Sequence, residues 1–300
     1  MLLNKKPIFI IGFARGGSNI LLNLLRSHPD LCSPRGELQE VFKGKSTESL
    51  YTKARKLMDY APILLRERRD IFSLTNWKPR SGLTDSTKVK IDKVLFYDKF
   101  KATLPSQNLY KTESVKYTHD EIAASRLLSK NLNGLIFLTP ELQKMYPDAT
   151  FIALVRNGLA VVEGHMRRGY SLEEFSAHYE TGCQQIIQDA KQYPNYHIVR
   201  YEDMIANPDP ELANIYRIID LDIELIKKIR LETKKVIGKD GSHDFRHQTS
   251  EKKVIWYDRQ DYFKHFMPNA NQNQINRLSQ DQRDRIKEIC KRSLDNFDYA

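Results

Sequence analysis

A glycine-rich segment near the N-terminus has the residue types and spacing of a phosphate-binding loop. It runs Gly12-Phe-Ala-Arg-Gly-Gly-Ser-Asn19, and the spacing from Gly12 to Gly17 is that of a Walker A loop. Free backbone N–H groups in such a loop, together with the N-terminus of the next helix, bind a phosphate. The Lys-Ser/Thr pair that would reach Mg²⁺ and the outer phosphates is missing after Gly17, and Arg15 supplies a cation inside the loop instead. The segment indicates an anion-binding loop, with a ligand-free glycine turn as the alternative.

A second cation follows another apolar run. Residues Thr150–Val155 lead into Arg156, where a metal-dependent NTPase of this topology usually carries a magnesium-binding Asp. Arg168 lies twelve residues further on, so the two side chains converge only if Arg156 precedes the helix that follows. Arginine suits phosphate geometry and stays charged, which favours a second phosphate far from the first loop. Two ordinary surface salt bridges are the alternative.

The elements expected to position these cations alternate between strand and helix. Pro7–Phe13 and Thr150–Val155 are continuous apolar runs, as in strands buried in a parallel sheet. Helices are expected after them, over Ile20–Leu25 and Leu159–Arg168, and a third strand at His197–Tyr201 extends the alternation. The pattern predicts a P-loop-type three-layer α/β fold, with a central parallel sheet flanked by helices.

The composition allows one large domain. The chain has 300 residues, 40% of them apolar, and no linker or repeat divides it. We expect a single domain, 1–300, with a charge-rich helical insertion at about 41–125. Near the C-terminus, Ser279 and Gln282 have capping-box spacing before one last apolar-striped helix that continues to Leu294.

Charge and cysteine usage narrow the class of ligand and the compartment. Lys and Arg number 48 against 38 Asp and Glu, and the net charge of +10 favours an anionic ligand, nucleic acid or acidic surface, with simple solubility as the alternative. No run approaches the ~20 apolar residues of a membrane span, so we expect no membrane insertion. The three cysteines are far apart and form no CxxC, which argues against a disulfide framework or cysteine zinc site and fits a cytoplasmic location.

Taken together, these segments resemble the sulfotransferase family, which uses 3′-phosphoadenosine 5′-phosphosulfate (PAPS) without a metal. Pro7–Asp30 is similar to its 5′-phosphosulfate loop, Tyr146–Gly158 to its 3′-phosphate segment, and Val199–Asp203 to the strand that follows. Further motifs look closest to the tyrosylprotein sulfotransferase branch: the Arg-Asn-Gly turn, Gly36-Glu37, Lys130-Asn131, Arg168 and Ile237-Gly-Lys239.

The resemblance implies roles in holding the cofactor. The residues that would bind the 5′-phosphosulfate are Arg15, Gly16, Gly17, Ser18 and Asn19. Arg156 and Arg168 would hold the 3′-phosphate, and Tyr201 would lie near the adenine, although a tyrosine ending a strand also commonly packs under a helix. Ser250 and Lys253 fall where the family closes a loop over the nucleotide.

The resemblance also implies the chemistry of transfer. Glu37 would take the proton of the acceptor hydroxyl as general base, and Arg15 and Lys130 would stabilise charge on the leaving and bridging oxygens. The alternatives are an ordinary loop glutamate and a solvated lysine. His165 and His119 are other candidate bases, each expected otherwise as a polar surface residue.

Departures from the family pattern concern the cofactor contacts. Gly164 stands where the family has a serine eight residues after the 3′-phosphate arginine, and Gly16 and Asn19 replace Ser and Thr in the loop.

The implied activity is sulfuryl transfer from PAPS to a hydroxyl of a carbohydrate, small molecule or protein tyrosine, with no nucleic-acid partner and a homodimer left open. A P-loop kinase or NTPase and a non-enzymatic binder of anionic nucleotides are the alternatives.

Overall fold

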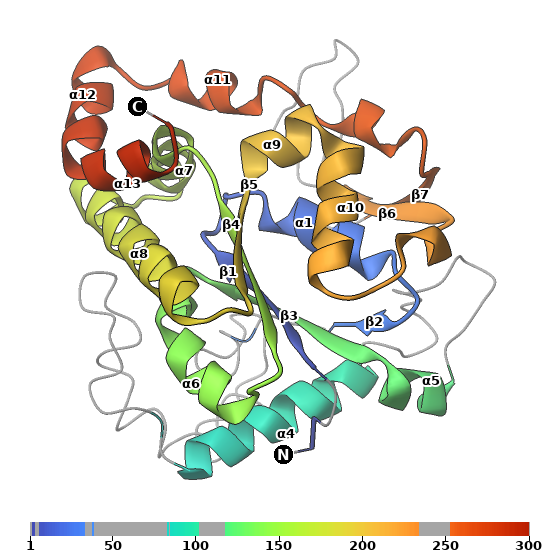
Figure 1. Ribbon diagram of the computed structural model, residues 1–300. Coiled ribbons are helices and arrows are strands. Elements are labelled where there is room, and N and C mark those ends of the chain that lie inside the picture. The colour runs from blue at the N-terminus through green and yellow to red at the C-terminus, as the bar shows by residue number, and fades with distance from the viewer. Residues whose placement is uncertain are drawn as a thin grey trace, which may run out of the picture.

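The computed structural model describes residues 2–3, 6–33, 38, 83, 85–101, 118–233 and 253–299. A five-stranded sheet lies at its centre in the order β2-β3-β1-β4-β5, and every strand pair in it is parallel (Figure 1). The strands are β1 (Ile8–Gly12), β2 (Leu31–Cys32), β3 (Arg126–Leu132), β4 (Thr150–Val155) and β5 (Tyr196–Arg200). The predicted α/β class with a central parallel sheet is confirmed.

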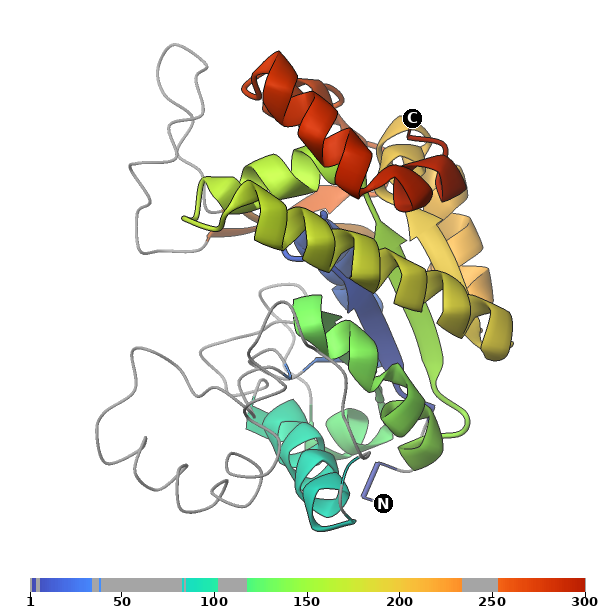
Figure 2. The same cartoon turned by 90° about the vertical axis from the view of Figure 1, so that its left-hand side faces the viewer.

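Helices cover both faces of this sheet, as Figure 1 and Figure 2 show. One layer consists of η2 (Asn133–Leu138), α6 (Thr139–Met145), α7 (Gly158–Met166), α8 (Leu172–Gln192), α12 (Gln280–Ile289) and α13 (Lys291–Asn296). The other consists of α1 (Ser18–Arg26), α9 (Tyr201–Ala206) and α10 (Pro208–Ile218). The remaining elements are α4 (Asp85–Lys101), α5 (His119–Ala124), η3 (Ile223–Leu225), the antiparallel pair β6 (Lys228–Thr233) and β7 (Lys253–Asp258), η4 (Tyr262–His265) and α11 (Ala270–Ile275).

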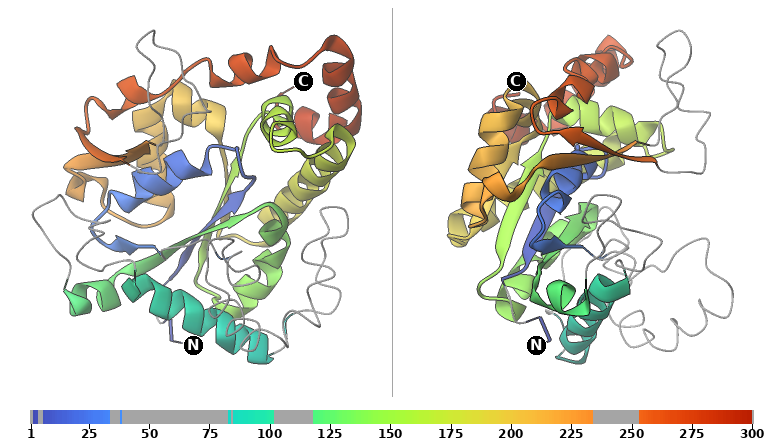
Figure 3. Two further views of the ribbon diagram at one scale, coloured as in Figure 1. Left: turned by 180° about the vertical axis from the view of Figure 1, so that it is seen from behind. Right: turned by 90° about the vertical axis from the view of Figure 1, so that its right-hand side faces the viewer.

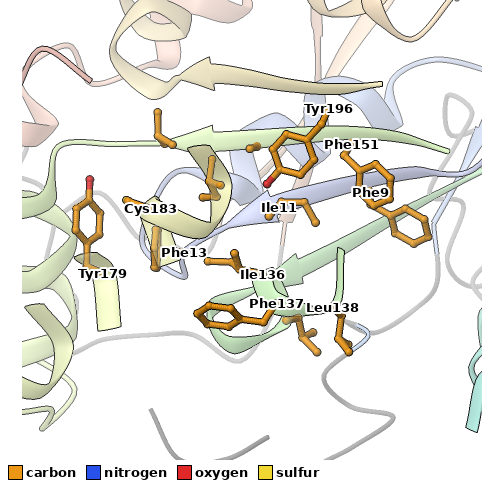
Figure 4. Close-up of a cluster of buried hydrophobic side chains, with 14 of the residues drawn as sticks. Phe9, Ile11, Phe13, Ile136, Phe137, Leu138, Phe151, Tyr179, Cys183 and Tyr196 are labelled. Atoms are coloured by element: carbon orange, nitrogen blue, oxygen red, sulfur yellow. The ribbon is translucent and has the colours of Figure 1, made fainter. Parts of the chain in front are cut away.

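The continuous apolar run of β1 is explained by burial on both faces of the sheet. Ile8 and Ile10 belong to the core shared with α1, whereas Phe9 and Ile11 belong to the core shared with α8. In the α8 core the rings of Phe9 and Phe151 stack with centroids 5.4 Å apart (Figure 4). Each such side chain contributes about 1.5–3 kcal/mol when buried. Successive side chains of β1 are therefore buried on opposite faces of the sheet, which holds the strand in place. The glycine-rich segment follows at its carboxyl end.

The predicted C-terminal helix is correct at its start and wrong at its end. Ser279 and Gln282 form the expected capping box at the N-terminus of α12. The helix does not continue to Leu294, because the chain leaves helical geometry at Cys290, with φ −95° and ψ 11°. The break turns the chain into α13, so that Ile286 and Leu294 both reach the α8 core (Figure 1).

The expected insertion at about 41–125 falls largely outside the described residues. Within it, α4 and α5 are helical as predicted, and α5 begins at a capping box formed by Thr118 and Glu121. Asp92 on α4 accepts hydrogen bonds from the Leu3 backbone N–H at 3.3 Å and from the Tyr146 hydroxyl at 2.9 Å. These bonds attach α4 to the N-terminal segment and to the end of α6. The single-domain organisation stays a prediction.

Asp189 on α8 gives the fold a testable pH dependence. Its side chain is fully buried, and burial raises its pKa from 3.8 to about 6, against the opposing hydrogen bond from Gln185. The folded state thus binds this proton more tightly than the unfolded chain does, so stability falls as the pH rises from 3.8 to about 6 and stays lower above that.

Asp189→Asn is therefore expected to stabilise the protein above pH 7, by roughly 3 kcal/mol, and to have little effect near pH 4. Thermal denaturation at pH 4, 5.5 and 7.5 measures the difference in Tm between the two proteins. Equal Tm values at pH 7.5 would contradict the assignment of a destabilising buried carboxylate.

Candidate active site

The glycine-rich segment forms a tight turn at the carboxyl end of β1. Gly12 has φ 151°, and a Cβ there would lie 2.5 Å from the Leu154 carbonyl oxygen of β4, so only glycine fits. Gly17, with φ 90°, caps α1 without a side-chain hydrogen bond. The Gly16 N–H donates to the Phe13 carbonyl oxygen at 3.0 Å and closes the turn. Among the described residues no side chain caps the first turn of α1, which has the form of an anion-binding helix N-terminus.

Arg156 lies beside this turn, at the end of the neighbouring strand β4. Arg156 precedes α7, as expected from the sequence, and Asn157 caps that helix through the Leu159 N–H at 3.0 Å. Arg156 is only 6% exposed, so it does not form the surface salt bridge that was the alternative. Its Nη1 donates to the Arg15 carbonyl oxygen at 2.7 Å. The two segments that the sequence marked as phosphate-binding are therefore hydrogen-bonded to each other.

Arg15 stands at the centre of a group of cations. Burial lowers the pKa of its guanidinium, and the charges of Arg168, Arg167 and Arg156 lower it further, with Glu163 opposing. The Arg15 Nε is buried and has no hydrogen-bond partner among the described residues. Three arginine charges that repel Arg15, and an Arg15 donor without a partner among the described residues, are features expected where an anion binds.

Lys130 reaches the same turn from β3. Its Nζ donates to Asn19 Oδ1 at 2.6 Å, and the side chain is 7% exposed. The alternative of a solvated lysine is wrong, because Lys130 lies inside a strand paired with β1 at Ile10. The strand thus places an ammonium group at the start of α1.

Tyr201, the first residue of α9, contacts both the glycine-rich turn and Arg156. A Cβ at Gly17 would lie 2.3 Å from the Tyr201 ring, and the Arg156 guanidinium stacks over that ring at 4.3 Å from its centroid. The tyrosine is 5% exposed and belongs to the α1 core. It therefore packs under the site, and a contact with adenine stays a prediction.

Arg168, Gly164 and His165 occupy the far part of α7 and the turn after it. Arg168 is exposed. A Cβ at Gly164 would lie 3.1 Å from the Arg15 Cβ, so the absence of a side chain makes room for Arg15.

The expectation that His165 is a surface residue is wrong. It is 1% exposed, its ring stacks on Phe175 at 3.5 Å between centroids, and burial lowers its pKa to about 3. Its Nδ1 lies 2.9 Å from the Val161 carbonyl oxygen. A neutral imidazole packed in the core is poorly suited to accept a proton from a substrate. His119 is exposed, as expected.

The side chains of three expected site residues lie outside the described part of the chain. Glu37 and Ser250 lie outside the described residues. Lys253 begins β7 opposite Thr233, and its side chain is outside the described part of the chain.

Sequence reasoning missed the residues that hold Arg156. Its Nε donates to Asn271 Oδ1 at 2.7 Å and its Nη2 to Gln274 Oε1 at 2.5 Å. The amides of Asn271 and Gln274 donate in turn to Glu202 and Glu163. Each of these contacts joins α11 to residues at least 69 positions away, so no local spacing could reveal them.

A glycine-rich turn after the first strand of a parallel sheet, beside an arginine at the end of the neighbouring strand β4, is the arrangement of a P-loop-type α/β protein. Residues 7–224 match the model of the sulfotransferase family. Since the match covers most of the chain, the chain belongs to this family. The match does not distinguish the tyrosylprotein branch from others, so that finer assignment stays a prediction.

Solved structures of sulfotransferases are similar to the chain at low identity. The sulfotransferase domain of the Synechococcus olefin synthase is 18% identical, with 95% of each chain covered and a TM-score of 0.46. The sulfotransferase domain from the curacin biosynthetic pathway is 16% identical, with 98% of each covered and a TM-score of 0.47. A mouse sulfotransferase complexed with PAP is 13% identical over 97% of this chain and 85% of its own, with a TM-score of 0.42. None of the curated proteins matches the chain.

Two further features concern only the described residues. No group of three or more His, Cys, Asp or Glu side chains among them is arranged to hold a metal ion. None of their helices has the length and apolar character needed to cross a membrane.

Proposed function

We propose that this sulfotransferase uses PAPS as donor and transfers its sulfuryl group to an acceptor hydroxyl. The observation that carries the proposal is the direct hydrogen bond from Arg156 to the carbonyl oxygen of Arg15, which brings two phosphate-binding segments to one edge of the sheet. A ligand with two separated anionic groups, such as a 3′,5′-bisphosphate nucleotide, matches that arrangement.

The residues present fit such a nucleotide. The turn before α1 has the geometry of an anion site, and the unpartnered Arg15 Nε beside it is a donor in need of an acceptor. In this proposal residues 15–19 hold the 5′-phosphosulfate, and Arg156 and Arg168 hold the 3′-phosphate. Tyr201, Ser250 and Lys253 are further proposed contacts with the nucleotide.

Bound PAPS supplies a sulfuryl group on a phosphate leaving group, and the protein's part is to orient and stabilise charge. Arg15 and Lys130 stabilise the negative charge that develops on the leaving and bridging oxygens, since cations do this without Mg²⁺. The bond from Lys130 to Asn19 holds the ammonium group at the N-terminus of α1. Glu37 takes the proton of the acceptor hydroxyl as general base.

The acceptor side belongs to the proposed insertion at about 41–125. Carbohydrates, small hydroxyl compounds and tyrosyl peptides are the candidate acceptors, and the motifs shared with the tyrosylprotein branch keep the peptide among them. A labelled-sulfate transfer screen from PAPS against saccharide, phenol, lipid and tyrosyl-peptide acceptors tests this part. Transfer to at least one class is expected. Mg²⁺-dependent ATP turnover without any sulfate transfer would contradict the proposal and favour a kinase or NTPase.

A further inference from the structure

The short helix α11 lies across the end of the sheet that carries the site. Figure 1 and Figure 3 show it at the same end of the molecule as the start of α7, on which it packs. The family match ends at residue 224, so it assigns no role to residues 270–275. Two side chains of α11, Asn271 and Gln274, are turned inward and half-buried, whereas Gln272 and Asn273 are exposed.

The two inward amides bind one edge of the Arg156 guanidinium. Asn271 Oδ1 accepts from Nε at 2.7 Å, and Gln274 Oε1 accepts from Nη2 at 2.5 Å. With the bond from Nη1 to the Arg15 carbonyl oxygen, three of the five guanidinium N–H donors are engaged. One donor on Nη1 and one on Nη2 remain beyond these bonds, and such a pair matches two oxygens of a phosphate.

Each amide also separates Arg156 from a carboxylate. The Asn271 Nδ2 donates to Glu202 Oε1, which also accepts from the Asn157 N–H at 3.0 Å. The Gln274 Nε2 donates to Glu163 Oε2 at 3.0 Å, and Glu163 is 3% exposed. Both carboxylates thus reach the arginine through neutral amides rather than as direct ion pairs. A direct bidentate pair would occupy the donors that a phosphate needs.

The second carboxylate oxygen of Glu202 is hydrogen-bonded near the C-terminus of the chain. Its Oε2 accepts from the Tyr299 hydroxyl at 2.6 Å, and the Tyr299 ring lies under the Arg200 guanidinium at 4.9 Å. On the other side, Arg277 donates to Glu163 at 3.2 Å. These bonds hold both carboxylates in place, so that the amides between them and Arg156 have fixed positions.

From these contacts we propose that Asn271 and Gln274 are positioning residues that orient Arg156 toward the 3′-phosphate of the nucleotide. This inference rests on the proposed use of PAPS. Without the amides, Arg156 keeps its charge but turns toward the nearby carboxylates. Binding of the 3′-phosphate then weakens, while binding of the 5′-phosphate at the glycine-rich turn is unchanged.

The test is titration calorimetry with two nucleotides on the full chain. 3′-Phosphoadenosine 5′-phosphate (PAP) carries both phosphates, and 5′-AMP lacks the 3′-phosphate. The variants are Asn271→Ala, Gln274→Ala and their combination. Asn273→Ala and Gln272→Ala are matched controls on the exposed side of α11, and thermal denaturation checks that each variant folds.

The double variant is expected to bind PAP about 10- to 100-fold more weakly than wild type, with 5′-AMP affinity unchanged and the controls unaffected. In an Arg156→Ala background the same pair of changes is expected to cause no further loss, because the amides act through that guanidinium.

Three outcomes would overturn the inference. Unchanged PAP affinity would remove the positioning role, and tighter PAP binding would show that α11 blocks Arg156. An equal loss for PAP and 5′-AMP would indicate a purely structural role. A wild-type protein that does not bind PAP would instead overturn the proposed function, and this inference with it.

Discussion

The Arg15→Ala variant is expected to lose the thermal stabilisation that PAP gives to the wild-type protein, with PAP affinity at least ~100-fold weaker. The Arg15 Nε is a buried donor without a partner among the described residues, and the charges of three other arginines repel the Arg15 guanidinium. Its removal relieves that repulsion, so the free variant should be at least as stable as wild type. A thermal shift assay with and without PAP measures both effects.

Arg292→Ala, on the exposed side of α13, is a suitable control for loss of one positive charge. Full stabilisation by PAP in the Arg15→Ala variant would remove the glycine-rich turn from the binding site. Arg156→Ala is a less selective change, because it leaves the half-buried amide oxygens of Asn271 and Gln274 without their donor. Its folded stability is expected to fall together with its affinity for PAP.

The Glu37→Gln variant is expected to bind PAP normally and to turn over about 10²- to 10⁴-fold more slowly. Glutamine keeps the size of the side chain and cannot accept the hydroxyl proton. Labelled-sulfate transfer to an acceptor found in the screen measures turnover, and calorimetry measures PAP binding. Glu40→Gln, three residues along the chain, controls for loss of a neighbouring carboxylate. Retained activity in Glu37→Gln would move the base to another residue.

The strands next to the site could be predicted from sequence, but the strand that carries Lys130 could not. Apart from Thr150 at the start of β4, both β1 and β4 lack polar side chains, since both of their faces are buried. β3 lies between β2 and β1 and is equally buried, yet it contains Ser129, Lys130 and Asn131 in succession. These polar residues interrupt the apolar pattern, and they do so where the strand passes the glycine-rich turn.

Some residues of the candidate site could likewise be predicted from the sequence, and others could not. The glycine-rich turn and the arginine after β4 follow local rules of chain geometry and could be predicted from spacing. The partners of Arg156 on α11 could not, because Asn271 and Gln274 stand in a polar run, Asn-Gln-Asn-Gln, with no distinguishing pattern. Only the fold shows which two of these amides face the arginine.

His165 shows the limit of residue type as a guide. His165 follows Gly164, a position at which the sequence departs from the family pattern. From the sequence it was either a candidate base or a surface residue. Its ring instead packs on Phe175 in the core between α7 and α8, with a pKa far below neutral. A histidine serves as a catalytic base because it titrates near neutral pH. Burial lowers the pKa of His165 to about 3, so this property is lost.

The most direct test of the account is a crystal structure of the chain with PAP bound. The 5′-phosphate is expected against the backbone N–H groups of residues 15–19, and the 3′-phosphate within hydrogen-bond distance of Arg156. A nucleotide with only one of its phosphates held by these two segments, or bound elsewhere on the molecule, would contradict it.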